Sequence, residues 1–126
     1  MTVNFFQRRK ILKKLNYMEA TPIRKCNFET NEAGIVTLIV PKFKNEKFNT
    51  FFFHQRKRYF RIALDELGST VWLQIDGIIN VATICNKAEE LLGEKIQPVH
   101  DRIPKFFTML YEARYISFKE IEKESN

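Results

Sequence analysis

The chain has 126 residues, 44% of them apolar and 13% aromatic, which predicts one folded domain with a single core rather than a disordered chain. No uninterrupted apolar run approaches the ~20 residues of a membrane helix, and the charged N-terminus does not resemble a signal peptide. We therefore expect a cytoplasmic protein. Cys26 and Cys85 form neither a disulfide framework nor a metal motif, so free thiols in a reducing compartment are expected.

The formal net charge of +6 is unevenly distributed along the chain. Residues 1–63 carry 14 Lys and Arg against 4 Asp and Glu, a net +10, whereas residues 64–126 carry 7 against 11, a net −4. This asymmetry indicates an acidic or polyanionic partner for the first half, or two faces of one domain that attract each other.

The first half of the chain is predicted to be an N-terminal extension followed by strands. Residues 1–20 read as a basic extension with a short helix over 4–16, and residues 21–126 as a single domain. Thr21-Pro22 ends any helix, because the residue before proline avoids the α region. Three strands are then expected over 25–30, 35–40 and 59–64, with a turn at Gly34 after the first and a long connection over 42–58 after the second.

The second half is predicted to be helical. The apolar periodicity and the caps indicate helices over about 65–77, 80–93 and 98–114, the first two opened by an Asp and an Asn. Pro104 either kinks the third helix or marks its true first turn. A short extended tail follows over 115–118. Three strands followed by three helices predict an α+β fold.

Short motifs along this half occur in a characteristic order. They are Leu64-Asp65, Val71-Trp72, Asp76-Gly77, Val81 and Ile84, then Ile103, Phe106-Phe107, Leu110 and Tyr115-Ile116. Together they resemble the signature of the PqqD family, named for a small protein of pyrroloquinoline quinone biosynthesis, over roughly residues 20–118. The resemblance implies a winged-helix-like fold, in which a three-stranded antiparallel sheet is followed by a three-helix bundle.

The same resemblance implies a function. Related domains are RiPP recognition elements, peptide chaperones without catalytic activity that bind the leader of a ribosomally made precursor peptide. They bind it by β-augmentation and present it to a modifying enzyme, often a radical SAM enzyme. For this chain, the implied partners are therefore a leader peptide and such an enzyme.

The implied peptide site lies between one sheet edge and the third helix. Carried onto this chain, the edge consists of Tyr59, Phe60, Arg61 and Ile62, and the helix contributes Arg102, Lys105, Phe106, Met109 and Leu110. The three cations of this set would pair with acidic leader residues. The alternative is that its apolar members are plain core, which periodicity does not separate from a binding role.

Residues 42–61 combine seven cations and seven aromatic side chains with one acid. This mixture is typical of single-stranded nucleic acid binding, and it also suits an acidic apolar peptide, a partner protein or enzyme, a second copy of the chain, or a loop folded onto the core. A winged-helix nucleic-acid-binding protein is therefore the alternative function. Against it, Asp101 and Glu112 dilute the positive charge of the third helix.

Residues with catalytic chemistry are few. His54 and His100 lack metal-ligand spacing with either cysteine, and the sequence contains no Gly-rich phosphate loop or nucleophile elbow. Asp65 and Glu66 read as the start of a helix rather than as an acid and base pair. We expect a protein that is not an enzyme and that uses no metal or cofactor.

Overall fold

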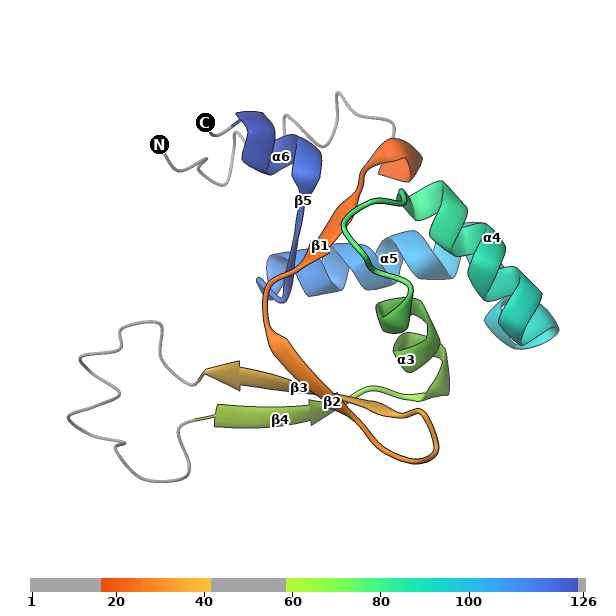
Figure 1. The fold of residues 1–126 in the computed structure, drawn as a ribbon. Coiled ribbons are helices and arrows are strands. Elements are labelled where there is room, and N and C mark those ends of the chain that lie inside the picture. The colour runs from red at the N-terminus through yellow and green to blue at the C-terminus, as the bar shows by residue number, and fades with distance from the viewer. Residues whose placement is uncertain (1–16, 42–58, 125–126) are drawn as a thin grey trace.

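The computed structural model describes residues 17–41 and 59–124, which form an α+β fold (Figure 1). The elements in chain order are η1 (Tyr17–Glu19), β1 (Pro22–Arg24), β2 (Asn27–Thr30), β3 (Val36–Pro41), β4 (Tyr59–Ala63), α3 (Glu66–Leu73), α4 (Val81–Leu92), η2 (Gly93–Ile96), α5 (Val99–Glu112), β5 (Ile116–Phe118) and α6 (Lys119–Glu124). The helix expected over 4–16 and the basic aromatic segment 42–58 lie outside the described residues. None of the described helices has the length and apolarity to cross a membrane.

The three predicted strands form an antiparallel sheet in the order β2-β3-β4, which confirms the α+β prediction. Phe28 is opposite Leu38, and Leu38 is opposite Ile62. Because side chains of a strand alternate between faces, these three residues share the face that packs on the helices. Leu38 is fully buried there, and the rings of Phe28 and Trp72 form a T-shaped contact with 5.9 Å between centroids.

A second, two-stranded sheet joins the two ends of the described chain, and the sequence did not predict it. β1 pairs antiparallel with β5, with Pro22 opposite Phe118. The backbone N–H and the hydroxyl of Thr21 both donate to the carboxylate of Glu120, at 2.8 and 2.9 Å. The extended tail expected over 115–118 is therefore a paired strand, and α6 anchors it.

The starts of α3 and α4 follow the expected caps, whereas α3 ends at Leu73, four residues before the end expected at residue 77. The Asp65 carboxylate accepts from the Gly68 N–H at 2.7 Å, and the Asn80 side chain accepts from the Thr83 N–H at 2.9 Å, as predicted. Pro104 lies inside α5, which rules out the second of the two alternatives, a place in the first turn, and α5 lacks the hydrogen bond that a residue with an N–H would donate there. Just beyond α5, Arg114 adopts a left-handed φ of 67°, which strains a residue with a β-carbon.

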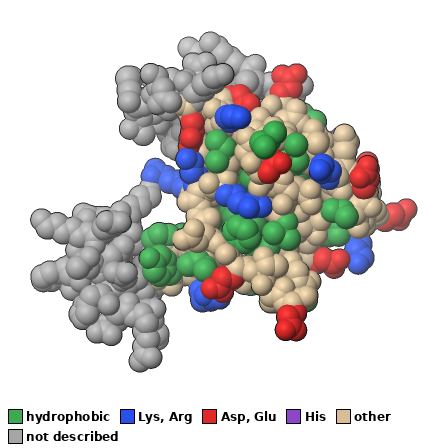
Figure 2. Space-filling view, in the orientation of Figure 1, with side chains coloured by type: hydrophobic (Ala, Val, Ile, Leu, Met, Phe, Trp, Pro, Cys, Tyr) green, Lys and Arg blue, Asp and Glu red, His purple; other side chains and the backbone are tan. Residues whose placement is uncertain are grey.

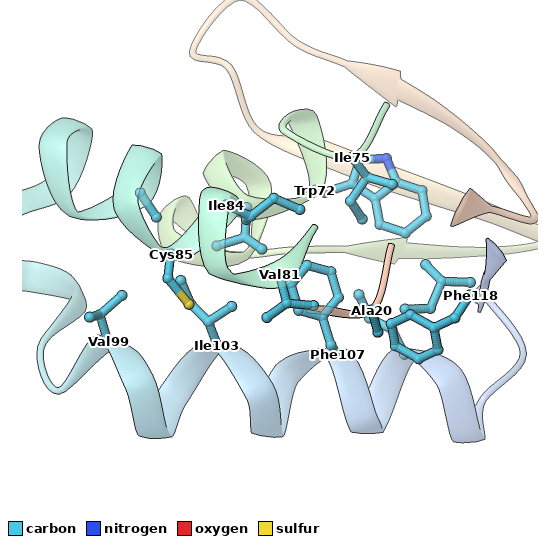
Figure 3. Close-up of a cluster of buried hydrophobic side chains, with 14 of the residues drawn as sticks. Ala20, Trp72, Ile75, Val81, Ile84, Cys85, Val99, Ile103, Phe107 and Phe118 are labelled. Atoms are coloured by element: carbon cyan, nitrogen blue, oxygen red, sulfur yellow. The ribbon is translucent and has the colours of Figure 1, made fainter. Parts of the chain in front are cut away.

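The core lies where α3, α4 and α5 meet the sheet and the chain ends (Figure 3). Val99, Ile103 and Phe107 of α5 point toward α4, and Trp72 of α3 is fully buried, with its ring against Phe28 of β2. Ala20 is also fully buried, and its carbonyl accepts from the Val81 N–H at 2.9 Å. Residues 17–20, which the sequence assigns to the extension, thus pack within the domain.

Candidate functional site

β4 forms one edge of the three-stranded sheet. Among the described residues, β3 is its only strand partner. The Leu64 N–H donates to the Val36 carbonyl at 2.8 Å, which sets the side of the chain that faces β3. Because antiparallel pairing alternates, Ile62 turns its main-chain groups toward β3, whereas Arg61 and Ala63 turn theirs outward. The outer edge of β4 therefore presents main-chain donors and acceptors.

A groove of about 490 Å³ lies beside this edge. The end of β4, the start of α3, η2 and one face of α5 contribute its lining. The lining residues are mostly apolar: Ile62, Ala63, Leu64, Asp65, Leu67, Gly68, Val71, Ile96, Arg102, Ile103, Phe106 and Met109. The groove and the strand edge share Ile62 and Ala63, so a chain lying along the edge would also lie over the groove.

Close contact between α3 and α5 at Gly68 shapes the floor of the groove. A β-carbon built on Gly68 would lie 3.3 Å from Cζ of Phe106 and 3.4 Å from Cβ of Leu64. Both distances are tighter than or at the limit of ordinary packing, so the missing side chain lets the Phe106 ring approach the α3 backbone. The sequence offered one signal for this contact, a glycine inside a predicted helix.

The two charged lining residues differ in how they are held. The Asp65 carboxylate is committed to the N-terminus of α3 through the Gly68 N–H. Nη1 of Arg102 donates to the Lys95 carbonyl at 2.7 Å, which positions the guanidinium and leaves four of its five N–H donors. Among the described residues, Arg102 is the only cation that lines the groove, and none of their carboxylates forms an ion pair with it.

Four of the residues predicted for the peptide site line the groove. They are Ile62, Arg102, Phe106 and Met109. Met109 is 55% exposed, so its side chain is accessible from the solvent. The structure thus places one predicted strand residue and three predicted helix residues around a common space.

The other predicted side chains lie elsewhere. The Arg61 side chain is on the opposite face of the sheet from Ile62, where it pairs with Glu29 and lowers the pKa of that carboxyl by hydrogen bonding and charge. Tyr59 shares that face, and Phe60 lies at the far end of β4. Lys105 pairs with Asp101 one turn away on the exposed side of α5, at 3.1 Å.

Leu110 does not belong to the groove. Its side chain is fully buried in the core, so the core alternative holds for this residue. Of the three cations expected to meet acidic ligand residues, only Arg102 lies at the groove.

Several lining residues were given no binding role from the sequence, among them Leu67, Gly68, Val71 and Ile103 in predicted helices and Ile96 between two predicted helices. Their apolar character and spacing indicate the core face of a helix, and the wall of an apolar groove has the same sequence pattern. Only the packing of three separate elements shows which apolar positions remain accessible.

The described residues contain no cluster of three or more His, Cys, Asp or Glu side chains that could hold a metal ion. Cys85 is buried and Cys26 is half-buried, and both are free thiols, as expected. Burial raises the pKa of each thiol, with the charge of Glu89 adding to the effect at Cys85. Both cysteines are therefore protonated and weakly reactive at neutral pH.

Comparison of the chain with protein-family models, with curated proteins and with solved structures finds no match.

Proposed function

We propose that this protein is a non-catalytic peptide-binding module. An extended peptide adds as a further strand to the outer edge of β4 and lays alternate side chains into the groove. One observation carries this proposal: an edge without a strand partner among the described residues lies directly beside an apolar groove. Main-chain hydrogen bonds supply affinity in this mode, and the groove supplies selectivity.

The fold supports the binding surface in a specific way under this proposal. The sheet and helices act as a winged-helix-like body, with α3, α4 and α5 as a three-helix bundle that braces the sheet from its inner face. Contact of α3 with β3 through Ser69, whose hydroxyl accepts from the buried Val36 N–H at 2.8 Å, holds the bundle against the strands. A rigid edge is what β-augmentation requires, because a pre-ordered strand lowers the entropic cost of binding.

The resemblance to the PqqD family supports a narrower version of the proposal. The peptide is then the leader of a ribosomally made precursor, and the protein presents it to a modifying enzyme of the radical SAM type. Such a step takes place in the cytoplasm, where two free thiols remain reduced. The residues that carry the family motifs support this version of the proposal, because many of them lie together in the core around Trp72 and Phe107.

The charge of the described residues does not favour the nucleic-acid alternative. Residues 17–41 and 59–124 contain 10 Lys and Arg against 14 Asp and Glu, a net −4, and α5 contains two of each sign. On the face shown in Figure 2, basic and acidic side chains are interspersed. Binding to a polyanion through α5 would require a predominantly basic surface.

A selection experiment tests the proposal. A random 12-residue peptide display library is selected on the full-length protein, and the affinities of recovered peptides are measured for wild type, Ala63→Pro and Ala63→Val. Proline removes the outward N–H of Ala63, and edge strands tolerate proline where the N–H faces solvent. Valine keeps the N–H and has a similar volume.

We expect the proline variant to bind roughly tenfold more weakly, because loss of one hydrogen bond with an unpaired partner costs about 1–3 kcal/mol. The valine variant should bind within about threefold of wild type. Peptides N-methylated at every second residue should lose binding only when the methylated residues are those whose N–H groups face β4. Equal affinities for the proline and valine variants would contradict β-augmentation. Binding that falls steeply with salt, competed by single-stranded oligonucleotides, would instead favour nucleic acid.

A further inference from the structure

We infer that the groove selects a peptide with apolar side chains at alternate positions and a carboxylate side chain N-terminal to them, held by Arg102. This inference rests on the proposed function and deepens it by naming the ligand's sequence pattern and direction.

The alternation follows from the register of β4. A peptide residue opposite Ile62 places its side chain on the same face as Ile62, which is the face of the groove. Residues opposite Arg61 and Ala63 place theirs on the other face, beside the Arg61–Glu29 ion pair. Every second peptide side chain therefore meets the groove, and those between them meet solvent.

The chemistry of the groove differs along its length. Phe106 lies against Gly68 and Leu64, so this part of α5 borders the end of β4. Met109, almost one turn later, extends the apolar wall in the direction of Ile62, because α5 and β4 run in opposite directions in Figure 1. Apolar peptide side chains fit this stretch.

The other end of the groove is polar. Arg102 lies one turn before Phe106 and is bound to the Lys95 carbonyl. The Lys95 ammonium lies 3.3 Å from the Glu66 carboxylate at the start of α3, so this end lies beyond the C-terminal end of β4. The fixed planar guanidinium, with donors to spare, matches a carboxylate in two parallel hydrogen bonds. The Asp65 carboxylate, which also lines the groove, accepts a hydrogen bond from the N-terminus of α3. Arg102 is therefore the lining residue whose charge selects the ligand.

The direction of the peptide sets the order of the pattern. The sheet is antiparallel throughout, and antiparallel pairing is the more stable kind. An antiparallel peptide has its N-terminal end beside the C-terminal end of β4, where Arg102 lies. Read from its N-terminus, the ligand thus presents the acid first and the alternate apolar residues after it.

Selection from the same random library with two matched variants tests this pattern. Arg102→Gln and Lys105→Gln each neutralise an exposed cation of α5, and only the first lines the groove. We expect wild type and Lys105→Gln to enrich Asp or Glu on the N-terminal side of the apolar residues, and Arg102→Gln to lose that enrichment while keeping the alternate apolar positions. A selected peptide whose acid is changed to its amide should bind wild type roughly tenfold more weakly, and should bind Arg102→Gln no more weakly than the acid does.

Each outcome separates the inference from the proposed function. Peptides that depend on the Ala63 N–H but show no acid enrichment, or show it on the C-terminal side, overturn the inference and leave the proposed function standing. An equal loss of the acid enrichment in Arg102→Gln and Lys105→Gln also overturns the inference. Recovery of no peptide that depends on the Ala63 N–H overturns the proposed function itself. Thermal unfolding of both variants checks that the exposed substitutions leave the fold intact.

Discussion

The Ser69 side chain makes the contact that fixes α3 against the sheet, and its removal gives a sharp test of the fold around the groove. Ser69 is 1% exposed, and its hydroxyl accepts from the N–H of Val36, a residue that is fully buried. Val36 directs this N–H toward β4, at the point where the chain leaves the sheet for α3. Ser69→Ala removes the acceptor while almost preserving the side-chain volume.

The expected loss of stability is about 1–3 kcal/mol, the cost of leaving a buried donor without a partner. This is a large part of the 5–15 kcal/mol that typically stabilises a domain. Urea unfolding followed by the fluorescence of Trp72, the only tryptophan of the chain and fully buried, measures the change. Amide hydrogen exchange at Val36 should accelerate in the variant.

Thr70→Ala is the matched control. The Thr70 hydroxyl donates to the Glu66 carbonyl within the same helix, on an exposed surface. Its removal should change stability by no more than about 0.5 kcal/mol. If Ser69→Ala were as mild as Thr70→Ala, the Val36 N–H would have another partner, and the proposed anchoring of α3 would be refuted.

Three further outcomes are expected. Leu110→Ala should leave a cavity in the core and cost about 2–5 kcal/mol of stability. Met109 is 55% exposed, so Met109→Ala should cost under about 1 kcal/mol of stability and instead weaken peptide binding. Similar unfolding curves for the two variants would contradict the placement of these side chains. Arg114→Gly should raise stability by about 0.5–1 kcal/mol in urea unfolding because it relieves a left-handed φ, with no gain for Arg114→Ala, which keeps the β-carbon. The Asp76 carboxylate accepts from backbone N–H groups three and two residues further on, which lowers its pKa below the ordinary 3.8. Its contribution to stability is thus present above that value and is lost as pH falls through the lower folded-state pKa; Asp76→Asn should remove this part of the acid dependence, and unchanged acid titrations of the unfolding midpoint would count against it.

The predictions from sequence that hold are local ones. Asp65 and Asn80 cap helices through hydrogen bonds that span three residues, and Gly34 has the positive φ of its turn. The strand predicted over 59–64 is likewise present as β4 (Tyr59–Ala63). Each of these features depends on neighbouring residues alone, so a sequence pattern of a few residues determines it.

The candidate site could be predicted from the sequence only in part, through the family resemblance. Arg102, Phe106 and Met109 reach the groove, whereas Leu110, next to Met109 in the chain, is buried. Adjacent helix positions point about 100° apart, so the rotation of α5 against its neighbours separates a groove wall from the core. That rotation results from packing at Gly68 and Phe107 and is not encoded in the periodicity of α5.

The sequence by itself determined the order and kind of most of the elements, the caps and turns that bound them, and an uneven charge. Only the tertiary structure decided that β1 pairs with β5, that Leu110 belongs to the core rather than to the groove, and that the Arg61 side chain lies away from the groove. These three features depend on contacts between residues far apart in the chain and on strand register. A shift of register by one residue would move Arg61 to the groove face without changing a single local preference.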